Sequence, residues 1–116
     1  MSNLWLKVAA VAGSSAVGLG AIGAHAMNKQ PEMYKDVWKT ASLYHFVHAL
    51  ALGVVSVAPF TARKKLITGT LFSMGILLFC GSCYTVSAMN QRKPYSLPAP
   101  FGGFCFIGGW LAFGFL

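Results

Sequence analysis

Three histidines are the residues of this sequence best suited to chemistry. His45 and His48 lie three positions apart in the stretch YHFVHALAL, and Tyr44 stands four positions before His48. On a helix these three side chains share one flank. Imidazole can ligate zinc or haem iron, and it titrates close to neutral pH. With His25 in an earlier apolar stretch, four interpretations are open: structural hydrogen bonds, a metal site, bis-histidine haem ligation, or a proton or ion conduit.

The structural interpretation is the one that the sequence favours. A neutral imidazole inside lipid needs hydrogen-bond partners, which backbone carbonyls and hydroxyl groups can supply. A metal held by His25, His45 and His48 would need carboxylates or carbonyls behind its ligands. The only acidic residues, Glu32 and Asp36, lie outside the apolar runs. No carboxylate inside a span is therefore available to orient a metal ligand or to continue a proton relay. We therefore predict no bound metal and no cofactor.

Cysteine and serine chemistry is not predicted either. Cys80 and Cys83 spell C-x-x-C inside an apolar run, where small apolar filling is the better interpretation. Ser14, Ser15 and Ser82 could act as nucleophiles only with a base, and no buried acid is available to orient a histidine. The glycines form no phosphate-binding loop followed by Lys and Ser or Thr. We predict that the protein is not an enzyme.

The composition identifies the solvent of this chain. Of its 116 residues 56% are hydrophobic and only 9% are charged, whereas a soluble domain carries about 25% charged residues. Most of the surface must therefore face lipid. Nine basic residues against two acidic ones give a net charge of +7. Because the basic residues form short clusters between apolar runs, they suit anionic lipid head groups, and no nucleic-acid partner is predicted.

Four apolar runs predict an all-α membrane protein with four transmembrane helices in one domain, residues 1–116. The runs cover about 4–27, 41–60, 66–89 and 101–116. They lack strand alternation, and only helices or closed barrels can span lipid. The fourth run has 16 residues, about 24 Å of helix, which is slightly short of a bilayer core. With four spans, Lys7 and the Arg63-Lys64-Lys65 turn lie on one side of the membrane.

The segment between the first two runs predicts an interfacial helix over about 31–40. Pro31 suits the first turn of a helix. Tyr34 and Trp38 recur on one face, and charged residues occupy the other. Such an amphipathic pattern is typical of a helix that lies in the membrane plane, with its aromatic rings at head-group depth.

Small residues at helical spacing predict how the helices pack. A stripe of Gly, Ala and Ser lets a neighbouring backbone approach closely, which drives helix association inside lipid. The predicted packing residues are Ala12, Ala16, Gly20, Ala24, Gly69, Ser73, Gly102 and Gly109.

Four motifs in chain order carry a resemblance to a known family. They are GAIGAHAM at 20–27, YHFVHALAL at 44–52, GILLFCGSCY at 75–84 and APFGGFCFIGGWLA at 99–112. Together they resemble the transmembrane protein 256 family, small membrane proteins with bacterial relatives. The resemblance implies four helices, no established enzymatic activity and, because animal members are mitochondrial, a place in the mitochondrial inner membrane.

The family pattern also covers the polar residues of the chain. An up-down hairpin of the first two spans would bring all three histidines to one membrane side, and we expect one polar cluster formed by His25, Tyr44, His45, His48, Ser82 and Tyr84. The expected function is that of an accessory or packing subunit, in contact with the lipid bilayer and with other membrane subunits or further copies of itself. A histidine-based metal or haem binder, or a small proton or ion conduit, is the alternative.

Overall fold

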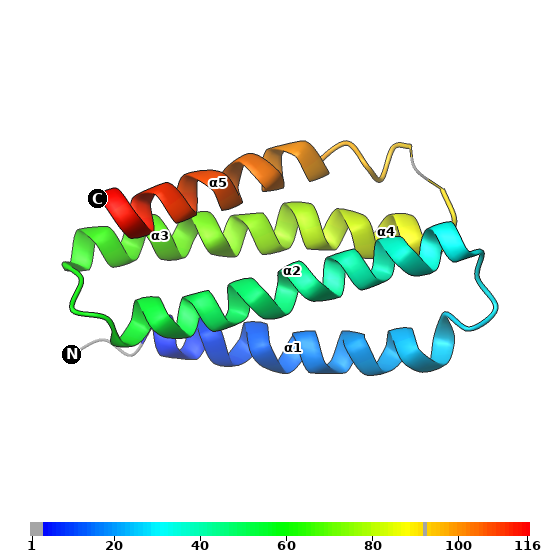
Figure 1. Cartoon of the computed structure of the whole chain (residues 1–116), viewed down its shortest axis with the longest axis horizontal. Coiled ribbons are helices and arrows are strands. Elements are labelled where there is room, and N and C mark those ends of the chain that lie inside the picture. The colour runs from blue at the N-terminus through cyan, green and yellow to red at the C-terminus, as the bar shows by residue number, and fades with distance from the viewer. Residues whose placement is uncertain (1–3, 92) are drawn as a thin grey trace.

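The computed structural model describes residues 4–91 and 93–116, and all of its regular structure is helical (Figure 1). The elements are α1 (Leu4–Ala26), α2 (Glu32–Val57), α3 (Ala62–Gly75), the π-helical turn η1 (Ile76–Cys80), α4 (Gly81–Met89) and α5 (Ala99–Phe115). Because α3, η1 and α4 run on without a break, the chain folds into four antiparallel rods, with the start of α1 and the end of α5 at one end of the bundle. The molecule is 46 Å long, close to the full thickness of a bilayer.

Three of these rods are long and apolar enough to cross a membrane: Leu4–Ala26, Glu32–Val57 and Ala62–Met89. The fourth, Ala99–Phe115, is apolar but has only 17 residues. The prediction of an all-helical protein is therefore confirmed. Three membrane spans are supported by length and composition among the described residues.

The separate interfacial helix predicted over 31–40 is wrong, because these residues form the first turns of α2. Pro31 does precede the helix, but no Gly or Pro follows before Gly53, so nothing interrupts the helical backbone. Trp38 is buried in the bundle and donates its indole N–H to the carbonyl of Leu19, 3.1 Å away. The helix then ends at Val57, two residues before Pro59, as the missing N–H of proline demands.

The third rod begins earlier than the apolar pattern predicted. Thr61 caps α3, and its hydroxyl accepts a hydrogen bond from the backbone N–H of Lys64 at 3.1 Å. An N-cap threonine satisfies one of the free N–H groups of the first turn. The basic turn therefore belongs to the helix itself. The charged ends of these basic side chains can reach out of the lipid, so their place in the helix does not prevent the third rod from crossing the membrane.

The helices pack through small residues, although not all of the predicted ones take part. Ala12 and Ala16 are buried, and any side chain at Gly69, Gly102 or Gly109 would collide with Trp5, the backbone of Phe79 or the ring of Phe72, respectively. A Cβ at Gly20 would make only ordinary contacts with α2. Ala24 is exposed instead, because the face of α1 drifts with the 3.6-residue period and Gly23 takes the contact with Trp38. Ser73 lines a cavity rather than a seam.

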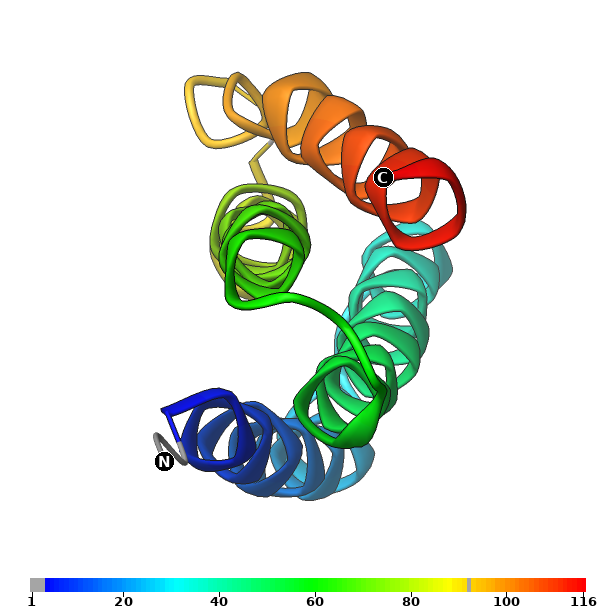
Figure 2. The same cartoon turned by 90° about the vertical axis from the view of Figure 1, so that its left-hand side faces the viewer.

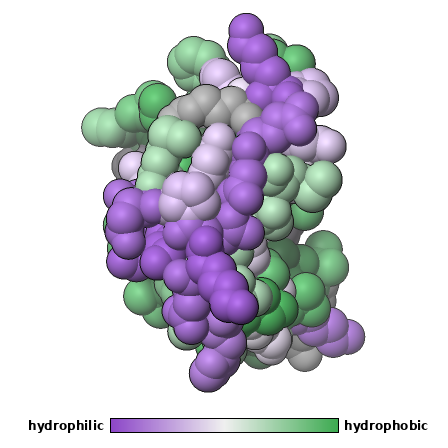
Figure 3. Space-filling view, turned by 90° about the vertical axis from the view of Figure 1, so that its right-hand side faces the viewer, coloured by the Kyte–Doolittle hydropathy of each residue, from purple (hydrophilic) through white to green (hydrophobic). Residues whose placement is uncertain are grey.

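The end-on view shows how the rods are arranged (Figure 2). The first rod lies along α2, and α5 lies along α3. Between α1 and α3 the direct contact is slight, and it includes the ring of Trp5 against Gly69. Hydrophilic residues cover the end formed by the α1–α2 turn and the segment before α5 (Figure 3). The sides of the rods carry the exposed apolar residues that lipid requires.

Candidate functional site: two buried imidazoles

His45 connects three helices from the middle of α2. Its Nδ1 lies 2.9 Å from the hydroxyl of Tyr84 in α4, and its Nε2 lies 3.1 Å from the hydroxyl of Ser15 in α1. The Ser15 hydroxyl donates to the carbonyl of Ala12 at 3.0 Å, so it must accept from His45. Tyr84 then donates to the free nitrogen. These roles define a neutral imidazole that carries its proton on Nε2.

His48 lies one turn further along α2 and faces the other side of the bundle. Its Nδ1 is 2.7 Å from the carbonyl of Tyr44 and must donate to it. Its Nε2 accepts from the indole N–H of Trp110 in α5 at 2.9 Å. The ring also stacks on Phe106, with ring centroids 3.7 Å apart. His48 is therefore a neutral imidazole with its proton on Nδ1, and both of its nitrogens are engaged.

The predicted polar cluster is only partly assembled. The structure brings His45 and Tyr84 together, and the ring of Tyr44 lies beside His48, with centroids 6.0 Å apart. His25 is exposed near the end of α1, ten residues or about 15 Å of helix beyond Ser15. Ser82 donates to the carbonyl of Tyr95 instead.

The cause of this difference is the continuity of α2. The prediction placed His45 and His48 near the start of a span, because the preceding residues were assigned to a separate helix. In one helix that begins at Glu32, both histidines lie near its centre, where His45 faces the middle of α1 and His48 faces α5. The expectation that all three histidines share one membrane side is therefore wrong.

This geometry bears on metal and haem binding. A metal needs a free imidazole lone pair, whereas Tyr84 and Trp110 already donate to the acceptor nitrogens of His45 and His48. Among residues 4–91 and 93–116, no three His, Cys, Asp or Glu side chains gather closely enough to hold a metal. The arrangement can fix the rotation and register of α1, α4 and α5 against α2.

Sequence reasoning missed the two partners that complete these networks, Ser15 and Trp110. Each carries a polar group on an apolar helix, and the indole N–H of a tryptophan inside lipid usually finds an acceptor. Spacing within a helix shows which residues share a face, but it does not show which face of another helix lies opposite. The signal that could have found them is the need of each polar atom for a partner inside lipid.

Replacing Ser15 with alanine is expected to lower the unfolding free energy by about 1 kcal/mol, because the Nε2–H of His45 loses its acceptor. The matched control is Ser14→Ala, at the neighbouring exposed position of the same helix. Thermal unfolding of both variants in one detergent makes the comparison. Equal melting temperatures would show that the Ser15–His45 hydrogen bond does not hold α1 in place.

The sequence of this chain is similar to those of a known family. A family described as "Protein of unknown function (DUF423)" matches residues 19–103. The UPF0382 membrane protein YwdK of Bacillus subtilis is 38% identical, over 94% of this chain and 91% of the relative. A UPF0382 membrane protein of Staphylococcus aureus is 36% identical over 94% and 90%. The fission yeast Schizosaccharomyces pombe has one that is 34% identical over 93% and 95%. No solved structure matches the chain.

The chain thus belongs to the DUF423/UPF0382 family of membrane proteins. The match covers most of the chain and nearly the full length of each relative. Bacterial relatives, which the resemblance to the transmembrane protein 256 family implied, are confirmed, and that resemblance is compatible with the membership.

Proposed function

We propose that the protein is an accessory subunit that associates with other membrane helices through the outer face of α1. This face, the outer stripe, is formed by Ala10, Ser14, Gly18 and Ala21, all exposed. Glycine costs a helix about 1 kcal/mol relative to alanine, yet a Cβ at Gly18 would meet no atom within 4 Å. Packing within the chain gives no reason for glycine there. A second helix that approaches closely would explain a glycine at this position.

The position of α1 supports the same proposal. It packs along α2 on one side, and its contact with α3 is slight. A helix at the margin of a bundle, with small residues turned outward, is suited to accept a neighbour. That neighbour is a helix of another subunit or of a second copy.

We further propose that α5 is a fourth transmembrane helix. Its 17 residues span about 26 Å, a few ångströms less than a bilayer core, and local thinning can absorb this difference. Two observations support it: α5 packs along α3 and η1, which belong to a rod long enough to span, and the start of α1 and the end of α5 lie at one end of the molecule. An even number of crossings accounts for the second observation.

The proposed location is the mitochondrial inner membrane or its bacterial equivalent. Relatives of nearly the same length in two bacteria and a yeast support this, because a mitochondrial protein of bacterial ancestry would have such relatives. The protein should therefore be purified from the inner-membrane fraction.

Gly18→Leu is expected to separate the protein from its partner, because a bulky side chain keeps two backbones apart. The tagged chain is purified in mild detergent from the inner-membrane fraction, and stoichiometric companions are quantified. Val17→Leu, at an exposed neighbouring position, is the control. We expect Gly18→Leu to retain at least tenfold less partner, equivalent to about 1.4 kcal/mol. A monomeric wild-type chain without companions, or equal retention by both variants, would refute the proposal.

A further inference from the structure

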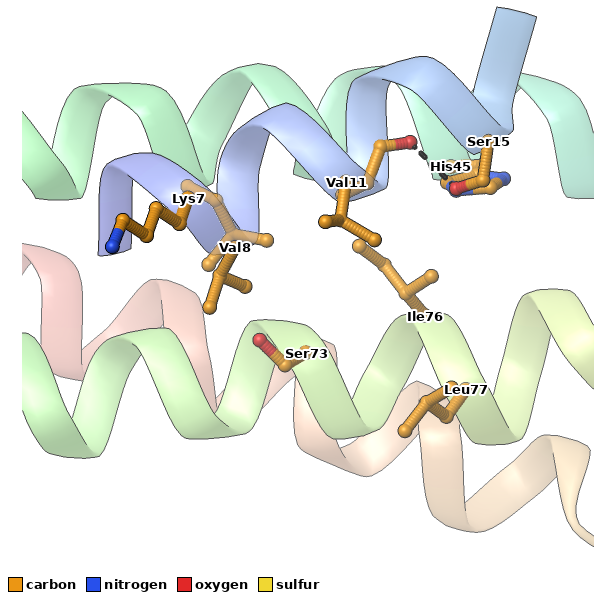
Figure 4. A pocket seen from close by; sticks show the side chains of 10 residues that line it. Lys7, Val8, Val11, Ser15, His45, Ser73, Ile76 and Leu77 are labelled. Atoms are coloured by element: carbon orange, nitrogen blue, oxygen red, sulfur yellow. Dashed lines mark hydrogen bonds between the residues drawn. The ribbon is translucent and has the colours of Figure 1, made fainter. Parts of the chain in front are cut away.

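A groove between α1 and α3 opens sideways toward the lipid (Figure 4). Its cavity has a volume of about 370 Å³, within the range of sites that hold small molecules. Val11 on α1 and Leu77 on η1 form facing walls, and both side chains are mostly exposed. The lining is almost entirely apolar, so the groove fits a hydrocarbon chain.

Polar groups mark three points along this groove. Lys7 lies at one end, and Ser15 with His45 lies at the other, eight residues or about 12 Å further along α1. Between them, the Ser73 hydroxyl oxygen is buried and has no hydrogen-bond partner among the described parts of the chain. A bound molecule would therefore have a long apolar body and a charged group at the Lys7 end.

The charge around this end is positive. The first turn of α3, with Arg63, Lys64 and Lys65, lies at the same end of the bundle as the start of α1. Lys65 donates to the Ser56 carbonyl and Lys64 lies over the ring of Phe60, whereas Lys7 and Arg63 are exposed. The only two acidic side chains of the chain belong to α2, at the opposite end. An apolar groove with Lys7 at its end and further basic residues at the same end of the bundle is suited to a lipid with an anionic head group.

We infer that the α1–α3 groove binds one anionic phospholipid, with its phosphate at Lys7 and one acyl chain along the wall between Val11 and Leu77. A helix about 10 Å wide would occupy roughly 900 Å³ over the same 12 Å, which is too much for this cavity. A neutral isoprenoid would fit the walls but would leave the ammonium group unused. Lys7 and Val11 lie on the flank of α1 that also carries Ser14 and Gly18 of the outer stripe. The two proposals are distinguished by what is measured, because Gly18→Leu is scored on protein companions and the groove variants are scored on retained lipid.

Native mass spectrometry of the full chain, released from vesicles of equal parts phosphatidylglycerol and phosphatidylcholine, tests this inference. The wild type is expected to retain one phosphatidylglycerol per chain. Val11→Trp and Leu77→Trp fill the groove from opposite walls and should each reduce retention at least tenfold. Ile22→Trp, exposed on α1 away from the groove, should not. Lys7→Gln should lower the preference for the anionic lipid about fivefold, and Lys29→Gln at the other end should leave it unchanged.

Several outcomes would overturn the inference. They are no retained lipid in the wild type, equal retention of the two lipids, or retention that survives both tryptophan variants. Occupation by a neutral isoprenoid extracted from native membranes would also overturn it. Each tryptophan variant is checked for its melting temperature, and because two walls are tested, the failure of one variant to fold leaves the other decisive.

Discussion

Gly102→Ala is expected to destabilise the protein by about 1–3 kcal/mol, while Gly103→Ala at the next position stabilises it by up to about 1 kcal/mol. A Cβ at Gly102 would collide with the backbone nitrogen and Cα of Phe79, whereas one at Gly103 would meet nothing within 4 Å. The neighbour of Gly102 is helix backbone, so it cannot turn aside as a flexible side chain would. The two helices must separate, and packing at the buried Phe106 is lost with them.

Thermal unfolding of both variants in the same detergent measures this difference. The comparison is well controlled, because both positions lie on α5 and gain the same methyl group and the same helix propensity. Opposite signs are the expected result. If both substitutions raise the melting temperature, α5 does not pack against η1 at Gly102 as the structure places it.

The helices of this fold could be predicted from the sequence because lipid imposes a simple pattern. Long apolar runs without strand alternation require helices, and the breaks at Pro31 and Pro59 lie where the backbone cannot continue. The continuity of α2 was missed because Lys35 and Lys39 suggested a polar surface helix. Charged residues at a helix end are compatible with one long helix that projects from the lipid, and only a breaker residue would have divided it.

The candidate site could be predicted in its composition but not in its connections. His45, His48 and Tyr84 were recognisable as polar groups inside apolar runs. Their partners depend on the rotation and offset of one helix against another, which no spacing within a single run determines. Because the start of α2 was predicted too late, both histidines were placed at the start of a helix, whereas they lie near the centre of α2. Their predicted proximity to His25 was wrong for the same reason.

The hydrogen bonds of His48 lead to the second large effect. His48→Leu is expected to cost about 1–3 kcal/mol, because the indole N–H of Trp110 then points at a hydrocarbon side chain. His48→Gln should cost much less. Its amide can accept from Trp110 and donate to the carbonyl of Tyr44, as the imidazole does. Melting temperatures of the two variants give the comparison.

A double-mutant cycle separates this hydrogen bond from the loss of packing. Trp110→Phe removes the donor, so His48→Leu made in that background should cost at least about 1 kcal/mol less than in the wild type. A ligand site predicts another pattern: Gln and Leu would be equally harmful, and a bound metal or a haem absorption would disappear in both. Elemental analysis and a visible spectrum of the pure protein complete the test. Additive losses in the cycle would contradict the pairing of His48 with Trp110, and a stoichiometric metal or haem lost in both variants would show that the imidazole acts as a ligand.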